Sequence, residues 1–133
     1  MRKIFMFGFS VLLFIVSACS TKLSEKEYFD AGYEQYNKQN FEEALKNFKL
    51  LIDYYPDGEF ASRSVFMIGF INANHVNNLD EAKEYYTLFI EKYPDDDLVA
   101  SAKYELETLG KSIDELPIFQ KMEGDSADTT GQN

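Results

Sequence analysis

The sequence has little of the chemistry that an active site or a metal centre requires. Its 133 residues include one cysteine, Cys19, and one histidine, His75. A single histidine in a polar stretch, without a cysteine or carboxylate motif beside it, does not make a zinc site, so we interpret His75 as a solvated loop residue. The seven glycines form no phosphate-binding motif. We therefore expect a protein that is not an enzyme, with no cofactor, no metal and no small-molecule substrate.

Basic residues are also scarce. The chain has 13 Lys and Arg against 23 Asp and Glu, a net charge of −10. Nucleic acids are bound largely through Lys and Arg on their phosphates, so the sequence excludes nucleic acid as a partner. Anionic lipid headgroups would repel such a chain as well. The acidity is explained most simply by solubility, and a basic partner is the alternative.

The single cysteine follows a segment with a recognisable pattern. Residues 1–3 include two basic side chains, residues 4–16 are mostly apolar, and Ser17 and Ala18 are small. This order is typical of a secretory signal peptide. The apolar run is shorter than the 17–25 residues that a membrane-spanning helix usually needs, which argues against an uncleaved anchor.

The end of this segment, Val16-Ser17-Ala18-Cys19, resembles the lipobox of bacterial lipoproteins. The resemblance implies that residues 1–18 are removed and that Cys19 carries a covalent lipid such as palmitate. Residues 19–23 would then be a lipidated start and a short linker. The residue after the cysteine is Ser20 and not aspartate, which in that family favours the outer membrane, facing the periplasm, over the inner membrane. Cleavage would leave 11 basic and 23 acidic residues, a net charge of −12.

The remaining sequence repeats itself at a shift of 38 residues. Residues 41–44 align with residues 79–82, and Pro56-Asp57 aligns with Pro94-Asp95. Self-similarity at a fixed period of this size is the mark of repeat architectures. Within the first repeat, apolar residues fall at steps of three and four, the period of an amphipathic helix: these are Ala44, Phe48, Leu51, Ile52 and Tyr55.

We predict helices over residues 25–38, 41–55, 59–74, 79–92 and 97–110 from this period and from boundary signals. Ser24 with Glu27 and Asn40 with Glu43 have the spacing of capping boxes. Pro56 and Pro94 end the helices before them, Asp95 to Asp97 supply anions to the first turn of the last helix, and Gly110 ends that helix. Asn74 to Asn78 are expected to form an extended turn. Residues 111–120 should be a short helical or extended segment, and residues 121–133 a disordered acidic tail.

The residues that mark the repeats resemble the tetratricopeptide repeat, a helix–turn–helix with fixed aromatic and small positions. The resemblance implies an all-α solenoid over residues 24–110, with two helix–turn–helix repeats and a C-terminal capping helix. The "YYP" and "KYP" helix ends and the lipobox resemble in particular two groups of periplasmic lipoproteins, the BamD group of outer-membrane assembly and the YbgF (CpoB) group of the Tol–Pal system. The positions that match the tetratricopeptide pattern are Tyr28, Gly32, Ala44, Phe48 and Pro56 in the first repeat, and Phe66, Gly69, Ala82, Tyr86 and Pro94 in the second.

In such repeats the first helix of each pair lines a groove that takes a peptide or a helix. Carried over by position, the resemblance places Phe29, Tyr33, Tyr36 and Asn37 of the first repeat and Phe70, Ala73 and Asn74 of the second in this groove. Aromatic residues suit binding because they bring large contact area at a low entropic cost. The alternative is that they fill the core between repeats. We expect that alternative for Phe48 and Phe66 and leave it open for Tyr33 and Tyr36, which have little obvious core to fill.

Two classes of function follow. The first is a lipid-anchored scaffold that binds a protein segment in the cell envelope, with a BamD-like role in outer-membrane protein assembly or a YbgF/CpoB-like role in Tol–Pal function and cell division. The second is a structural lipoprotein that binds peptidoglycan through its aromatic residues.

Overall fold

The computed structural model describes residues 22–112 and 115–116. In this part of the chain it contains only helices, as the sequence predicts. They are α1 (Glu25–Asn37), α2 (Phe41–Tyr54), α3 (Ala61–Ile71), the π-helical turn η1 (Asn72–Val76), α4 (Leu79–Lys92) and α5 (Val99–Thr108). The predicted signal peptide, Cys19 and the predicted acidic tail lie outside the described residues.

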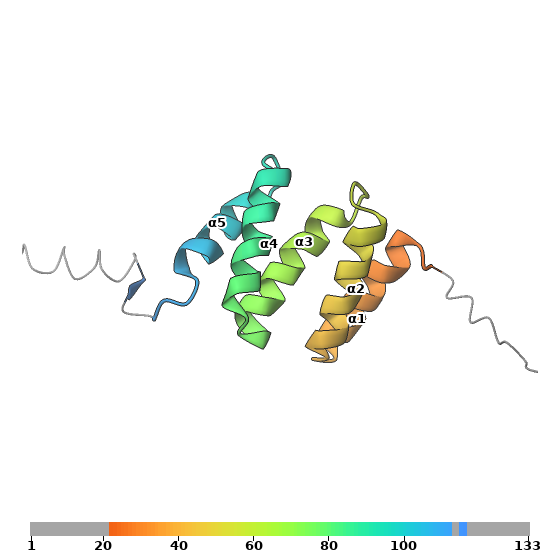
Figure 1. Cartoon of the computed structure of the whole chain (residues 1–133), viewed down its shortest axis with the longest axis horizontal. Helices are drawn as coiled ribbons and strands as arrows, with labels where there is room; N and C mark the ends of the chain where they lie inside the picture. The colour runs from red at the N-terminus through yellow and green to blue at the C-terminus, as the bar shows by residue number, and fades with distance from the viewer. Residues whose placement is uncertain (1–21, 113–114, 117–133) are drawn as a thin grey trace, which may run out of the picture.

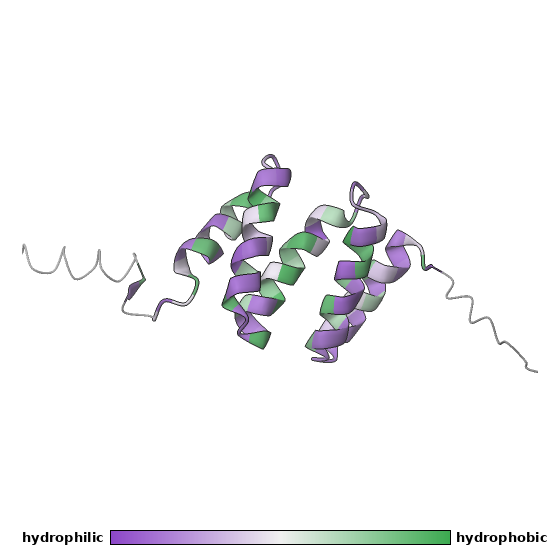
Figure 2. Cartoon of the chain, viewed as in Figure 1, coloured by the Kyte–Doolittle hydropathy of each residue, from purple (hydrophilic) through white to green (hydrophobic). Residues whose placement is uncertain are grey.

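The helices form two antiparallel hairpins followed by one further helix (Figure 1). Helix α1 packs on α2, α3 packs on α4, and α2 and α3 bring the hairpins together, with α5 against α4. Apolar residues of each helix gather on the sides that face neighbouring helices (Figure 2). Because a single hairpin cannot bury its apolar face alone, the stacked arrangement is what makes the core continuous.

The alanine and aromatic positions that mark the second helix of each repeat agree in burial between the two repeats. Ala44 and Ala82 have no exposed surface, and neither do Phe48 and Tyr86. Each of these rings lies against a glycine of the preceding helix: a Cβ on Gly32 would stand 2.6 Å from Phe48 Cε1, and the corresponding distance from Gly69 to Tyr86 Cδ1 is 3.0 Å. The small residue of the repeat pattern is therefore where two helices approach most closely.

The predicted start of α1 is confirmed in detail. The Ser24 hydroxyl accepts from the Glu27 backbone N–H at 3.4 Å, and the Glu27 carboxylate accepts from the Ser24 backbone N–H at 2.8 Å, a complete capping box. The second predicted box is wrong, because Asn40 makes no side-chain cap and donates instead to Gln35 Oε1 at 2.9 Å.

The last helix is shorter than the predicted range 97–110 at both ends, since α5 runs from Val99 to Thr108. Helix α5 begins at Val99, after the run of three aspartates, and not at residue 97. The Asp96 carboxylate accepts from the Leu98 backbone N–H at 2.9 Å, so the run forms the turn before the helix. Gly110 follows the helix with φ +73°, the left-handed conformation that suits a C-terminal glycine.

Helix α5 has a polar outer face. At the repeat shift, Lys103 corresponds to the buried Val65 and Glu107 corresponds to Gly69, and both charged residues are exposed. A charged side chain at either position would disfavour another helix packed there. Terminal helices of repeat arrays require such polar surfaces, so α5 has the properties of a capping helix.

The connection between α3 and α4 is not the extended turn that the sequence predicts. The chain continues helically after Ile71 through η1, and the Asn72 carbonyl accepts from the Asn78 backbone N–H at 2.9 Å. Asn77 closes the turn with φ +59°. Such π-helical turns insert an extra residue into a helix, and here the insertion carries His75 toward the first hairpin.

Candidate protein-binding surface

The predicted groove residues separate into two groups in the structure. Phe29 and Tyr33 are half-buried and join the first hairpin to its neighbours. The Phe29 ring stacks on Phe60 with centroids 4.5 Å apart, and the Tyr33 ring meets Phe48 edge-on at 5.4 Å. The expectation that Tyr33 has little core to fill is therefore wrong.

The burial of Tyr33 also affects the pKa of its hydroxyl. Loss of solvent raises the pKa of the Tyr33 hydroxyl above its usual value, while the nearby Arg63 charge acts in the opposite direction. Burial also raises the pKa of Tyr86, whose hydroxyl has no hydrogen-bond partner among the described residues. Both shifts follow mainly from packing, and the nearby charge of Glu105 raises the pKa of Tyr86 further.

The second group includes Tyr36 and Phe70, which form an aromatic surface where α1, α2, α3 and η1 meet. Phe41 and His75, which the sequence analysis did not place in the groove, complete this surface. We call Tyr36, Phe41, Phe70 and His75 the Tyr36 cluster. The His75 ring stacks on Phe41 with centroids 4.2 Å apart and an interplanar angle of 10°. Tyr36 meets Phe70 edge-on at 6.5 Å, and its hydroxyl oxygen lies 3.4 Å from His75 Nε2. Tyr36 also packs against the first core cluster, so it joins core and surface.

The structure corrects the interpretation of His75 as a solvated loop residue. The side chain is exposed, yet its ring contacts three aromatic rings of the Tyr36 cluster. The sequence offers no signal for this position, because it depends on the extra residue of η1. The remaining predicted groove residues lie around the cluster: Asn37 and Asn74 are exposed and Ala73 is half-buried.

Two hollows open beside the Tyr36 cluster. One has a volume of about 430 Å³ and the other about 520 Å³. Both are lined by Gln39, Phe41 and His75, and the larger one also has the carboxylates of Glu42 and Glu43. Aromatic rings beside acidic side chains form a surface that can take an apolar residue with basic neighbours.

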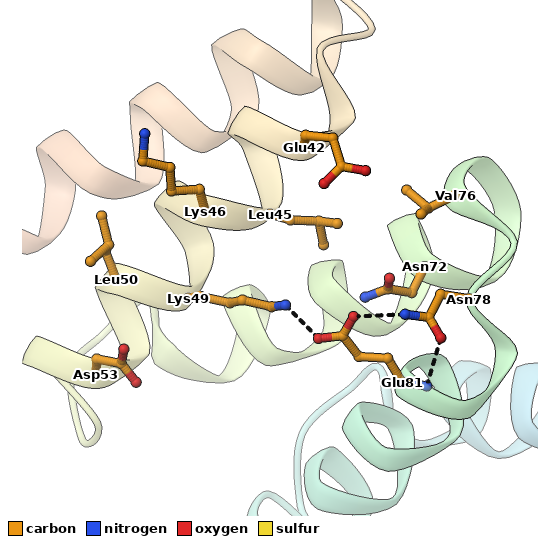
Figure 3. A pocket seen from close by; sticks show the side chains of 10 residues that line it. All are labelled: Glu42, Leu45, Lys46, Lys49, Leu50, Asp53, Asn72, Val76, Asn78 and Glu81. Atoms are coloured by element: carbon orange, nitrogen blue, oxygen red, sulfur yellow. Dashed lines mark hydrogen bonds and ion pairs between the residues drawn. The ribbon is translucent and has the colours of Figure 1, made fainter.

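A cleft that the sequence analysis did not find lies between α2 and α4 (Figure 3). Its volume is about 420 Å³. Lys49 on α2 forms an ion pair with Glu81 on α4, and Glu81 also accepts from Asn78 Nδ2 at 3.2 Å. The ion pair crosses the cleft and ties the two hairpins together, while the Asn78 bond lies within the cap of α4 (Figure 3). Asn72 forms part of the wall, fully buried, and donates to the Ile68 carbonyl at 3.0 Å.

No group of three or more His, Cys, Asp or Glu in the described part of the chain is placed to hold a metal ion. None of the helices described is long and apolar enough to cross a bilayer. The two surfaces present hydrogen-bonding amides and carboxylates, and the Tyr36 cluster adds aromatic rings.

Stacked helical hairpins with an aromatic surface on one side define an all-helical protein of the hairpin-repeat type. A family model described as "Outer membrane lipoprotein", YfiO, matches residues 21–117 and so covers every helix of the structure. The chain belongs to this family of outer membrane lipoproteins. Comparison with curated proteins gave no match, and neither did comparison with solved structures.

Proposed function

We propose that this protein is a non-catalytic scaffold, held in the cell envelope by a lipid on Cys19, which binds a segment of a protein partner and has a BamD-like role in outer-membrane protein assembly. The two hairpins are then two tetratricopeptide repeats, and α5 is their cap. The family match supports the envelope role. It favours the BamD-like alternative over the Tol–Pal adaptor and over peptidoglycan binding.

The Tyr36 cluster carries the proposal. Four aromatic rings from separate elements converge at the surface beside two hollows. Binding energy at protein interfaces concentrates in such aromatic groups, where truncation of one residue commonly costs about 2 kcal/mol or more. Phe29 and Tyr33 are engaged in packing, so we leave them out of the proposed binding surface. Tyr36, Phe70, Asn37 and Asn74 remain in it and surround the open surface.

The charge of this surface favours a particular partner. Glu42 and Glu43 line the larger hollow, and Glu34 is exposed on the last turns of α1. An apolar anchor on a helix or extended peptide would fill the hollow, and basic residues beside it would meet the carboxylates. We therefore propose a peptide or helix segment with basic flanks as the partner.

Photo-crosslinking in intact cells tests the binding surface. A crosslinking amino acid at Asn37 or Asn74 should capture one protein of the envelope, since both positions are exposed beside the Tyr36 cluster. The matched control is Lys83, which is exposed on α4 and lines a different surface hollow. Capture from Lys83 alone would move the binding surface to α4, and equal capture from all three positions would indicate nonspecific contact.

The membrane anchor needs a separate test. Two or more acyl chains give stable anchoring, at about 0.8 kcal/mol per buried methylene. We expect Cys19→Ala to leave the protein unprocessed or released into the periplasm. Normal processing and equal membrane retention of the variant would overturn lipid anchoring, and the crosslinking result would be unaffected.

A further inference from the structure

The first described residues are held against the end of α2. Lys22 Nζ lies 4.2 Å from the ring centroid of Tyr55 and 4.8 Å from that of Tyr54. The Tyr55 hydroxyl donates to the Leu23 carbonyl at 2.8 Å. These contacts hold Lys22 and Leu23, which precede the cap of α1, against the end of α2.

The same edge exposes apolar surface. Leu23 is 37% exposed and Tyr54 is 46% exposed, and the Tyr54 ring is held by stacking on the buried Tyr28 at 5.8 Å. Among the described residues, the other large apolar side chains with comparable exposure are Leu88 on α4 and Tyr104 on α5. Those two lie in the second half of the array, away from this edge.

The distance from the anchor limits where this edge can lie. Lys22 lies three positions after Cys19, and an extended chain spans at most about 3.3–3.6 Å per residue, or about 10 Å in all. The headgroup layer of one leaflet is about 5–8 Å thick. A domain joined this closely to a lipid keeps its first residues within about 5 Å of the headgroup layer.

We propose that the edge formed by Lys22, Leu23 and Tyr54 rests in the lipid headgroup layer and fixes the orientation of the domain. The inference rests on the lipid anchor of the proposed function. Tyrosine is enriched at membrane interfaces because its ring is apolar and its hydroxyl is polar. Lysine can place its stem on apolar surface and its charge in the headgroups.

The charge around the edge indicates which lipids it meets. Asp57 and Glu59 follow Tyr54 in the next turn, and both are exposed. Lys92 pairs with Asp57 at 3.3 Å, and Lys22 is balanced by Glu59, so the edge has no excess of positive charge that would attract anionic headgroups. The edge therefore fits a surface of zwitterionic lipids. With the edge against the membrane, the array extends from the first hairpin toward α5 and α5 lies farthest along the chain from the anchor.

The experiment uses the absence of tryptophan from the chain. The mature lipidated protein carrying Tyr54→Trp is placed in phosphatidylcholine vesicles that contain a lipid with a nitroxide on its headgroup. We expect the Trp emission to lose most of its intensity relative to vesicles without nitroxide. Tyr104→Trp, at a more exposed site on α5, is the matched control and should keep its emission. Replacing part of the phosphatidylcholine with an anionic lipid should not increase the quenching at residue 54.

The outcomes separate the edge from the anchor. If both variants float with the vesicles but their tryptophans are quenched equally, or neither is quenched, the proposed membrane contact of the edge is wrong and the lipid anchor still holds. Protein that fails to float would overturn the anchor and the edge together. Tyr54→Trp retains an aromatic ring against Tyr28, and circular dichroism of the variant confirms its helical content before the measurement.

Discussion

Gly32 lies so close to Phe48 that a side chain on residue 32 would collide with the ring. The Cβ of an alanine there would stand 2.6 Å from Phe48 Cε1, and the ring is completely buried. Alanine is favoured over glycine within helices by about 1 kcal/mol, whereas overpacking a core costs about 1–3 kcal/mol. Because the contact is short and the ring is confined, the collision outweighs the gain in helix propensity, and the net effect on stability is unfavourable.

We expect Gly32→Ala to lower the free energy of unfolding, measured by urea denaturation and circular dichroism. Gly69→Ala is the matched comparison and should cost less, because its Cβ would lie 3.0 Å from Tyr86 Cδ1. Adding Phe48→Leu to Gly32→Ala should recover part of the loss by removing ring atoms. If Gly32→Ala were as stable as the wild type, the two helices would not pack as closely as described.

Ala82 is the buried small residue of α4, and it corresponds to Ala44 of the first hairpin. It has no exposed surface and packs among Val65, Tyr86 and Phe89. Ala82→Asp would bury a carboxylate without a partner, which costs several kcal/mol, so we expect a large drop in the urea midpoint. Ala100→Asp, at an exposed position of α5, should change it little. Equal effects of the two substitutions would contradict the packing of α4.

The capping box of α1 should make stability depend on pH. The side-chain and backbone hydrogen bonds from Ser24 lower the pKa of Glu27 below its usual 4.5. Because the folded pKa lies below the unfolded one, the ionised carboxylate adds stability above about pH 4.5 and loses it as the pH falls through the folded pKa. Glu27→Gln should therefore remove part of the acid-dependent fall in the urea midpoint. A fall identical to that of the wild type would show that Glu27 has no favourable partner.

The ion pair across the α2–α4 cleft should couple the hairpins measurably. The side chains of Lys49 and Glu81 are 37% and 25% exposed, against 69% and 58% for Lys26 and Asp30 on α1. A double-mutant cycle with Lys49→Met and Glu81→Gln should give a coupling of up to about 1 kcal/mol, and the exposed pair about 0.3–0.5 kcal/mol. A weaker coupling for the cleft pair than for the α1 pair would contradict its bridging role.

The helices were predictable because their signals are local. The bounds of α4 agree with the sequence prediction, and those of α1 and α2 agree to within one residue, since periodicity and Pro56 mark them directly. The π-helical turn was not predictable, because an inserted residue leaves the apolar period on both sides unchanged. Asn40 was misread because a capping box needs a backbone geometry that its spacing does not reveal.

The binding surface was predictable only in part. The repeat resemblance grouped Tyr36 with Phe70, and their ring centroids lie 6.5 Å apart in the structure, but it could not distinguish them from Tyr33, whose ring packs on Phe48. The contribution of His75 and the cleft at Lys49 both depend on how the two hairpins sit against each other. That relationship is set by side-chain packing over long sequence distances and has no local signature.

The most direct test of the proposed function is recovery of the crosslinked partner with Phe70→Ala. Phe70 is half-buried at the Tyr36 cluster, and truncation should remove an aromatic anchor while leaving the main core intact. We expect the partner to be lost, with wild-type membrane levels and helical content, whereas Leu88→Ala on the outer face of α4 should retain it. Full recovery of the partner with Phe70→Ala, or unfolding of the domain by that substitution, would contradict a binding surface at the Tyr36 cluster.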